Sequence, residues 1–418
     1  MGSAARPAPG QDRRPGANLM LVLTATMAVG PLLTHSLSAM SPLVVADLGL
    51  TESQFGLLAS VTFFAAAVTA VRTGRWADRL SARTLLAVMF GGAALSMLLT
   101  AAAPGYAVLL LAMVLSGLGQ VMANPATNRL IRLHVPAHRR ASWLGVKQAG
   151  VQAAQLVAGL VFPVLGLLLG WRTAVLTAAG AVLLLLVHSW RTVPDNHDNA
   201  PPPRAPGRMP GRPPDAGPGR AGAPARAPMP GVVRAYAAAA ALTGLGAQAA
   251  NVYLPLYAHR GLGLDVVAAG ATVAVSALVG IVSRVLWARV MDRPGADGFA
   301  LLAVMAVGAA GSAALLVLAG LRPGLAWTVW PAAVLHGGAA LAVSVVVMSG
   351  AMRAVPADRV GASTGVVTMG LYAGFCTGPL VLGVLLQLTG SFAVGWAVVL
   401  VCYLACGMLA AVFRSRAR

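Results

Sequence analysis

Long apolar runs constrain this chain more than any other feature. The hydrocarbon core of a membrane is about 30 Å thick, so a helix crosses it with about 20 mainly apolar residues. Runs of this length recur from end to end of the sequence, at residues 18–40, 54–72, 84–103, 106–129, 142–168, 172–190, 233–258, 266–286, 298–320, 326–351, 360–387 and 391–413. The pattern predicts an all-α membrane protein with twelve transmembrane helices.

The composition excludes a soluble fold. Of the 418 residues, 58% are hydrophobic and only 10% are charged, whereas a soluble domain typically carries about 25% charged residues. A soluble fold has nowhere to bury so much apolar surface. The chain should therefore have the lipid bilayer as its main partner.

The net charge of +19 could indicate a nucleic-acid partner, but the position of the charges does not. Nearly all of the 30 Lys and Arg fall in the tails, in alternate loops or at the adjoining span ends; the exceptions are Arg172, Arg260 and Arg322. Cytoplasmic loops carry such an excess. We therefore expect a multi-pass protein of the cytoplasmic (inner) cell membrane, with both termini cytoplasmic and no nucleic-acid partner.

The twelve spans form two groups of six. The loop Gly74–Arg83 after the second span returns in weaker form at Ser283–Gly295, which indicates two related halves. The stretch between the halves is rich in Pro, Gly and Arg and should be a disordered linker. We expect a cytoplasmic tail (1–17), a six-helix bundle (18–190), a cytoplasmic linker (191–232), a second six-helix bundle (233–413) and a short cytoplasmic tail (414–418).

This organisation resembles the major facilitator superfamily. The most specific resemblance is the loop after the second span, where Gly74, Asp78, Arg79 and Arg83 match the family motif, and Asp292 and Arg293 repeat part of it. Ser81, Ala82 and Ala288 depart from it. The resemblance implies two six-helix bundles that rock around a central cavity lined by the first, fourth, seventh and tenth spans. It also implies that the loop aspartate acts as a latch, for which plain topology-setting charge is the alternative.

Polar side chains recur along single helix faces within several spans. Such side chains are costly against lipid, so they should face a bundle interior or water. They could hydrogen-bond neighbouring helices together or contact a substrate. Gln148, Gln152 and Gln155 in the fifth span favour the first role. The substrate-cavity candidates are His35, Gln120, Asn124, Asn128, Arg129, Lys147, Gln248, Asn251, Tyr253 and His336.

Two pairs of ionisable residues carry sharper hypotheses. Lys147 and Arg129 could attract an anionic group in the cavity, and ordinary charge at the inner membrane surface is the alternative. His35 and His336 lie well inside spans and titrate near neutrality, so either could carry a coupling proton. A buried, hydrogen-bonded histidine is the alternative for both.

Small residues recur at four-residue spacing in the eleventh span, at Gly370, Gly374 and Gly378. Such a face lets two helix backbones approach closely, and we expect it to serve helix packing.

The function that these patterns favour is secondary active transport of a small organic solute, neutral or anionic, by alternating access. One alternative is proton-coupled efflux of a drug or secondary metabolite. Another, of a different class, is a transporter-like membrane receptor or scaffold. The chain lacks the sequence motifs of nucleotide-binding, metalloprotease and hydrolase sites, and its three Cys lie in apolar runs. We therefore expect no enzyme activity, no cofactor and no metal, and a monomer.

Overall fold

The computed structural model describes residues 17–136, 139–193, 229–356 and 359–417, without the side chains of residues 71–79, 141, 323, 416 and 417. An α-helix satisfies its own backbone polar groups, which suits the apolar runs to a membrane. The helices are α1 (Ala17–Ala39), α2 (Ser41–Leu48), α3 (Glu52–Arg79), α4 (Ala82–Ala101), α5 (Tyr106–Gln120), α6 (Ala123–His134), α7 (Arg140–Leu169), α8 (Trp171–Thr192), α9 (Gly231–Arg260), α10 (Val266–Met291), α11 (Gly298–Leu321), η3 (Pro323–Thr328), α12 (Val329–Gly338), η4 (Ala340–Ala342), α13 (Val343–Arg353), α14 (Val360–Thr389) and α15 (Phe392–Ala417).

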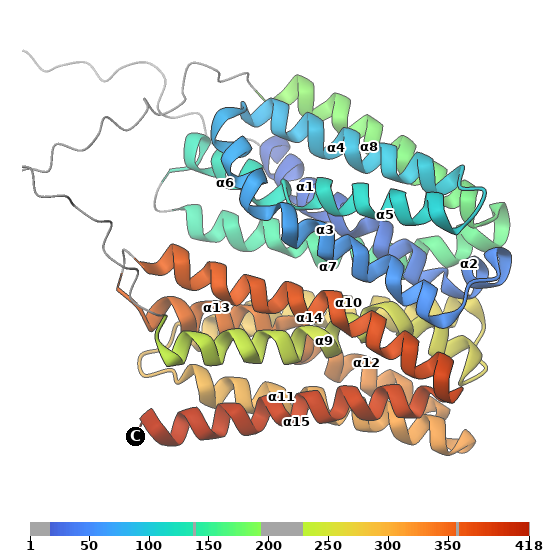
Figure 1. The fold of residues 1–418 in the computed structure, drawn as a ribbon. Helices are drawn as coiled ribbons and strands as arrows, with labels where there is room; N and C mark the ends of the chain where they lie inside the picture. The colour runs from blue at the N-terminus through green and yellow to red at the C-terminus, as the bar shows by residue number, and fades with distance from the viewer. Residues whose placement is uncertain (1–16, 137–138, 194–228, 357–358, 418) are drawn as a thin grey trace, which may run out of the picture.

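The helices form two bundles that lie side by side. Figure 1 shows α1–α8, in blue to green, above α9–α15, in yellow-green to red. The start of α1 and the end of α15 lie at the same end of the molecule, which we call the terminal end. The short helix α2 lies at the opposite end, which we call the α2 end.

Eleven segments within the described residues are long and apolar enough to cross a membrane. Helix α9 is the twelfth span predicted from the sequence, and it falls below that hydropathy criterion. It carries Gln248 and Asn251, and its residues from Gly246 to Ala258 are all buried inside the protein. A helix surrounded by protein needs less hydropathy than one surrounded by lipid. The predicted all-α membrane fold with twelve spans is confirmed.

Two of the predicted spans are broken helices. The fourth span divides into α5 and α6 after Gln120, and the tenth divides at Gly338 into α12, η4 and α13. A break frees carbonyl groups that lipid cannot satisfy. At the tenth span, Ser283 Oγ donates to the Gly337 carbonyl at 2.9 Å, and Trp287 Nε1 donates to the Gly338 carbonyl at 2.8 Å. Side chains of α10 therefore stabilise the broken helix.

The glycine face of α14 packs directly against the backbone of α9. A Cβ atom at Gly370, Gly374 or Gly378 would lie 2.2–2.3 Å from a carbonyl oxygen of α9. Only glycine permits so close an approach. The packing role expected for these residues is confirmed.

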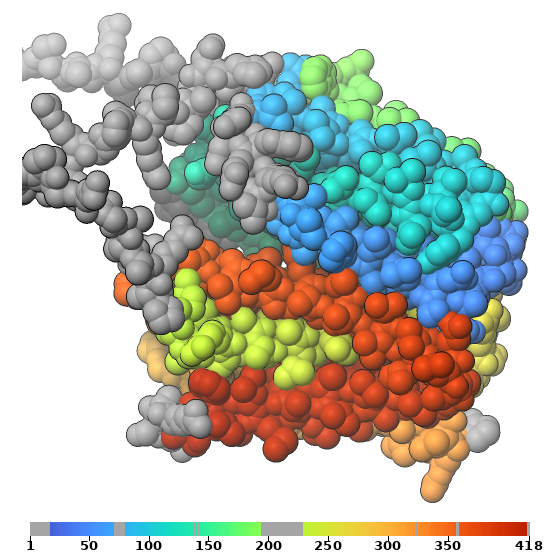
Figure 2. Space-filling view, viewed as in Figure 1, coloured from blue at the N-terminus to red at the C-terminus, as the bar shows by residue number. Residues whose placement is uncertain are grey.

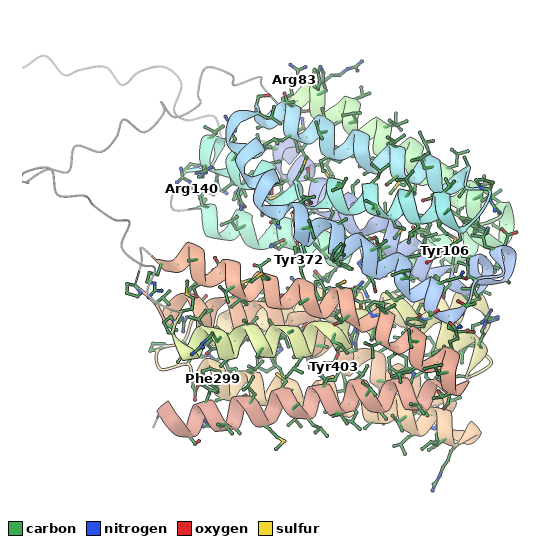
Figure 3. All side chains as sticks on the ribbon, viewed as in Figure 1. Arg83, Tyr106, Arg140, Phe299, Tyr372 and Tyr403 are labelled. Atoms are coloured by element: carbon green, nitrogen blue, oxygen red, sulfur yellow. The ribbon has the colours of Figure 1, made fainter. Side chains whose placement is uncertain are left out.

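The contacts between the bundles are concentrated toward the α2 end. Helix α3 packs against α14, α7 against α10, and α1 against α9, and Figure 2 shows the blue α3 surface meeting orange α14. Phe63 of α3 meets Tyr372 of α14 where the two bundles touch, with ring centroids 6.4 Å apart. Figure 3 labels Tyr372 between the bundles. At the α2 end, Tyr253 Oη donates to the Glu52 carbonyl at 2.6 Å, and Ser53 bonds Gln387.

The terminal end is bonded differently. Within the described residues, the hydrogen bonds and ion pairs at that end join helices of the same bundle, as Arg353 and Asp292 do at 3.6 Å. Within the described residues, the side-chain hydrogen bonds that join the two bundles therefore lie toward the α2 end.

Candidate functional site

Lys147 is the centre of a polar cluster between α6 and α7. It lies two turns into α7, and its side chain is only 1% exposed. Its Nζ donates to Asn128 Oδ1 at 2.6 Å, to Thr127 Oγ1 at 2.8 Å and to Asn124 Oδ1 at 3.3 Å. These are three acceptors for the three N–H groups of an ammonium.

The three acceptors around Lys147 are all neutral. Thr127 uses its own hydroxyl proton on the Ala123 carbonyl at 2.6 Å, so its oxygen is left to accept from Lys147. No carboxylate of the described residues pairs with this ammonium. The cluster thus fits the charged form of Lys147 and leaves a net positive charge between α6 and α7. Thr127 was not among the predicted residues, because a threonine in a helix gives no distinctive signal.

Arg129 points elsewhere. It is buried on α6 and donates to the Leu80 carbonyl in the turn between α3 and α4. The structure therefore does not bring Arg129 and Lys147 together around one group. Whether either attracts an anion stays a prediction.

A second cluster centres on Asn251 of α9 and joins both bundles. Its Oδ1 accepts from Gln155 Nε2 of α7 at 3.0 Å and lies 3.2 Å from His336 Nε2 of α12. Its Nδ2 donates to Gln248 Oε1 at 3.3 Å. Because Asn251 Oδ1 can only accept, the proton of the His336 ring is on Nε2 in this arrangement. Ser38 of α1 donates to the Asn251 carbonyl at 2.5 Å.

Four buried polar atoms around this cluster have no hydrogen-bond partner in the described structure: Thr34 Oγ1, Gln120 Oε1, Gln152 Oε1 and Gln248 Nε2. They come from α1, α5, α7 and α9. They are connected through packing, because Gln120 packs on Gly30, one turn from Thr34, and Gln152 lies one turn from Gln155. Unsatisfied buried polar atoms are rare and each needs an explanation. A ligand or water between the bundles would supply the missing partners.

The remaining cavity candidates lie at the edges of these clusters. His35 is 7% exposed on α1, next to Thr34. Tyr253 lies in the bundle contact at the α2 end, where its ring meets Phe55 edge-on at 5.8 Å. Its role as a cavity residue stays a prediction.

The loop motif is only partly described. Gly74, Asp78 and Arg79 belong to the last turns of α3, and their side chains lie outside the described residues. Arg83 stacks on Trp190 of α8, with its guanidinium carbon 4.0 Å from the ring centroid. In the second copy Asp292 pairs with Arg353, and Arg293 is exposed. The latch role of Asp78 stays a prediction.

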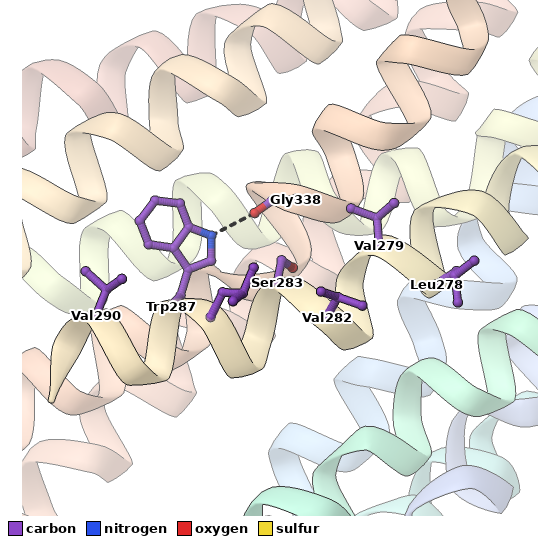
Figure 4. Close-up of a pocket in the computed structure, with 8 residues that line it drawn as sticks. Leu278, Val279, Val282, Ser283, Trp287, Val290 and Gly338 are labelled. Atoms are coloured by element: carbon purple, nitrogen blue, oxygen red, sulfur yellow. Dashed lines mark hydrogen bonds between the residues drawn. The ribbon is translucent and has the colours of Figure 1, made fainter.

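A groove of about 480 Å³ lies apart from these clusters. It is lined by α10 and by Gly338 at the break of the tenth span, and its lining is almost entirely apolar, with Trp287 bonded to the Gly338 carbonyl (Figure 4). Leu278 and Val282 on this face are more than half exposed. These features are typical of a lipid-facing surface, and the groove offers no polar recognition.

The amino-acid sequence matches a known protein family over most of its length. The sequence model described as the Major Facilitator Superfamily matches residues 19–379. Over 163 residues, the chain is also 32% identical to a protein named "Transcription regulatory protein OpdE" from Pseudomonas aeruginosa. This match covers 38% of the present chain and 39% of that relative, so the chain spans well under half the length of the curated relative.

Solved structures share the whole fold. A bacterial homologue of the human lysosomal transporter Spinster, in an inward-facing and occupied conformation, superposes with a TM-score of 0.73 at 17% identity, covering 95% of this chain and 96% of that one. The nucleoside transporter NupG superposes with a TM-score of 0.71 at 14% identity, covering 95% and 98%. At such identities these matches concern the fold and not the ligand.

Proposed function

The chain is a multi-pass membrane protein that belongs to the major facilitator superfamily, and we propose that it is a secondary transporter of a small organic solute. The solute binds between the bundles, and the bundles then rock to expose it at the other face. The observation that carries this proposal is the set of unpaired buried polar atoms from α1, α5, α7 and α9. They lie around the Asn251 cluster, where side chains of both bundles meet.

The distribution of bonds between the bundles supports alternating access. Such a transporter needs contacts at one end that can break while contacts at the other end form. The α2 end carries a few separable hydrogen bonds, such as Tyr253 to Glu52 and Ser38 to Asn251. Each is worth about 1 kcal/mol net, so a ligand's binding energy can shift the balance. We assign the terminal end to the cytoplasm, on the charge pattern of the loops.

A reversible lock at the α2 end tests the proposal. Ser53 of α3 and Gln387 of α14 bond each other across the seam, so Ser53→Cys/Gln387→Cys, with Cys376, Cys402 and Cys406 replaced by Ala, should form a disulfide on oxidation. The protein is reconstituted in proteoliposomes, and counterflow of labelled carboxylates, nucleosides, sugars and amino acids is measured. Its reduced form is the matched control.

Oxidation should abolish the counterflow of the solute that exchanges, and reduction should restore it. Exchange that continues with the disulfide formed would contradict alternating access. A panel in which no solute exchanges would count against transport itself.

We also propose that transport is coupled to protons. This includes the case in which a proton gradient drives export of the solute. His336 contacts the Asn251 cluster directly, and His35 lies beside Thr34. If they carry the proton, the His35→Ala/His336→Ala variant should exchange solute in counterflow but should not accumulate it on a proton gradient. Normal accumulation by this variant would exclude both residues as carriers.

A receptor that regulates transcription is the candidate from another class. The relative from Pseudomonas aeruginosa is named a transcription regulatory protein, and the match to it covers 38% of this chain. This name favours the receptor. A receptor would bind the solute without moving it across the membrane. The counterflow measurement therefore separates the two functions.

A further inference from the structure

Arg284 is a cation inside a membrane-spanning helix. Helix α10 runs from Val266 to Met291, so Arg284 lies two turns, or about 10 Å, before its end. The span predicted from the sequence ends at residue 286, so the sequence alone indicates that Arg284 is a charge at the membrane surface. A charge within a span costs about 3 kcal/mol or more and usually has a function.

Arg284 has no partner in the described part of the chain. It makes no hydrogen bond, ion pair or ring contact there, and its Nε is buried with no acceptor. The five carboxylates whose side chains are described are already engaged: Asp47 by Arg172, Glu52 by Arg260, Asp265 by the first turn of α10, Asp292 by Arg353, and Asp297 by Arg414. None of them is left to neutralise Arg284.

The position of Arg284 follows from the packing of α10 on α7. Gly159 of α7 lies against Gly270 of α10, and Gln152 lies against Gly280. Arg284 is one turn beyond Gly280 on the same face. Continuing this antiparallel pairing by one turn brings Arg284 to the level of Lys147, two turns into α7.

This level lies on the terminal side of the cross-bundle hydrogen bonds. The cross-bundle bonds of Gln155 and Ser38 to Asn251 all lie closer to the α2 end. Two other ionisable groups lie near this level, Lys147 on α7 and His336 on α12. Lys147 adds a positive charge, and the neutral His336 ring adds none. Within the described residues, the surroundings of Arg284 therefore hold positive charge and no free carboxylate.

We propose that Arg284 binds the anionic group, a carboxylate or a phosphate, of the transported solute. This inference rests on the proposed transport function and names its substrate class. A guanidinium offers two parallel N–H donors to two oxygens of such a group, in a geometry that a lysine cannot match. Lys147, whose three N–H groups are already used, favours the anion through its charge and not through a bond.

The test uses probes of matched shape that differ in charge. The purified full chain is titrated with benzoate against benzyl alcohol, and with phenyl phosphate against phenol, and binding is followed by tryptophan fluorescence. The wild-type protein is compared with Arg284→Gln and Arg284→Lys. Arg289→Gln is the matched control, because Arg289 is exposed on the same helix and its loss removes the same charge.

The wild-type protein should bind at least one anion and not its neutral counterpart. Loss of a charge-assisted contact should raise the dissociation constant of that anion by about tenfold or more in Arg284→Gln. Arg284→Lys should give an intermediate value, and Arg289→Gln should stay within about twofold, because an exposed charge contributes little.

Unchanged affinity in Arg284→Gln, or no preference of the wild-type protein for any anion, would overturn the assignment. If phosphatidylglycerol in vesicles competes with benzoate for binding, the anion at Arg284 is a lipid headgroup. This result would also overturn the assignment. Counterflow separates this result from failure of the proposed function. A neutral solute that exchanges equally well in wild type and Arg284→Gln would leave transport standing and exclude only the anion.

Discussion

Removing a hydrogen-bond acceptor of Lys147 should destabilise the fold more than removing the Lys147 side chain itself. Thr127 is fully buried, and its Oγ1 accepts from Lys147 Nζ at 2.8 Å. Thr127→Val keeps the shape but leaves one N–H of a buried ammonium without an acceptor, on the fully buried side of the cluster. An unmade hydrogen bond to a charged group costs about 1.5–3 kcal/mol. We expect Thr127→Val to lower the free energy of unfolding by about 2 kcal/mol.

Lys147→Met should change stability much less. It loses three hydrogen bonds, but it also removes the cost of burying a charge, and these effects nearly cancel when an apolar side chain of similar length fills the space. Asn124 and Asn128 are exposed and can then bond water. We expect a change within about 1 kcal/mol, and Thr127→Val should cost almost nothing in the Lys147→Met background.

The assay is a double-mutant cycle measured by chemical unfolding in detergent micelles. The coupling energy between Thr127→Val and Lys147→Met should be about 2 kcal/mol. Asn128→Leu is the control, and it should cost less than Thr127→Val because Asn128 is an exposed residue, where water can take the place of the lost acceptor. Additive effects of the two substitutions would mean that Lys147 is not held as a charged, fully bonded ammonium.

Three further outcomes follow from the structure. Gly374→Ala should lower the unfolding temperature, since its Cβ would lie 2.2 Å from an α9 carbonyl, whereas Gly365→Ala, in open space on the same helix, should not. Tyr253→Phe loses one bond across the seam and should raise the population open at the α2 end about fivefold, as measured from spin-label distances. Hydrogen bonds from Trp171 and then Arg172 lower the pKa of Asp47. Its stabilisation is therefore present above the ordinary Asp pKa of about 3.9 and is lost as pH falls below it, so the unfolding temperature should drop less on acidification in Asp47→Asn.

The transmembrane helices could be predicted from the sequence because membrane thickness fixes the length of an apolar run. The same ruler cannot find breaks within a span. The run at 326–351 is mainly apolar from end to end, yet it divides at Gly338, because Ser283 and Trp287 from a helix distant in sequence satisfy the freed carbonyls. Helix–helix contacts of this kind depend on the docked bundles and leave no periodic signal in either segment.

The candidate site could be predicted only in part, for the same reason. Asn124 and Asn128 share a helix face and were found by their spacing, and both contact Lys147. Arg284 was missed because the predicted span ended at residue 286, five residues before α10 ends at Met291. A shift of little more than one helical turn changes the interpretation of a charge from surface to interior.

Alternating access is measured most directly as a pair of distances between spin labels at the two ends of the contact between the bundles. Labels at Thr51 and Leu388 report on the α2 end, and labels at Leu133 and Met352 report on the terminal end, all at exposed positions. We expect two populations with opposed changes, in which the α2 end opens as the terminal end closes. A fixed distance at the α2 end under all conditions, including in Tyr253→Phe, or ends that open and close together, would contradict it.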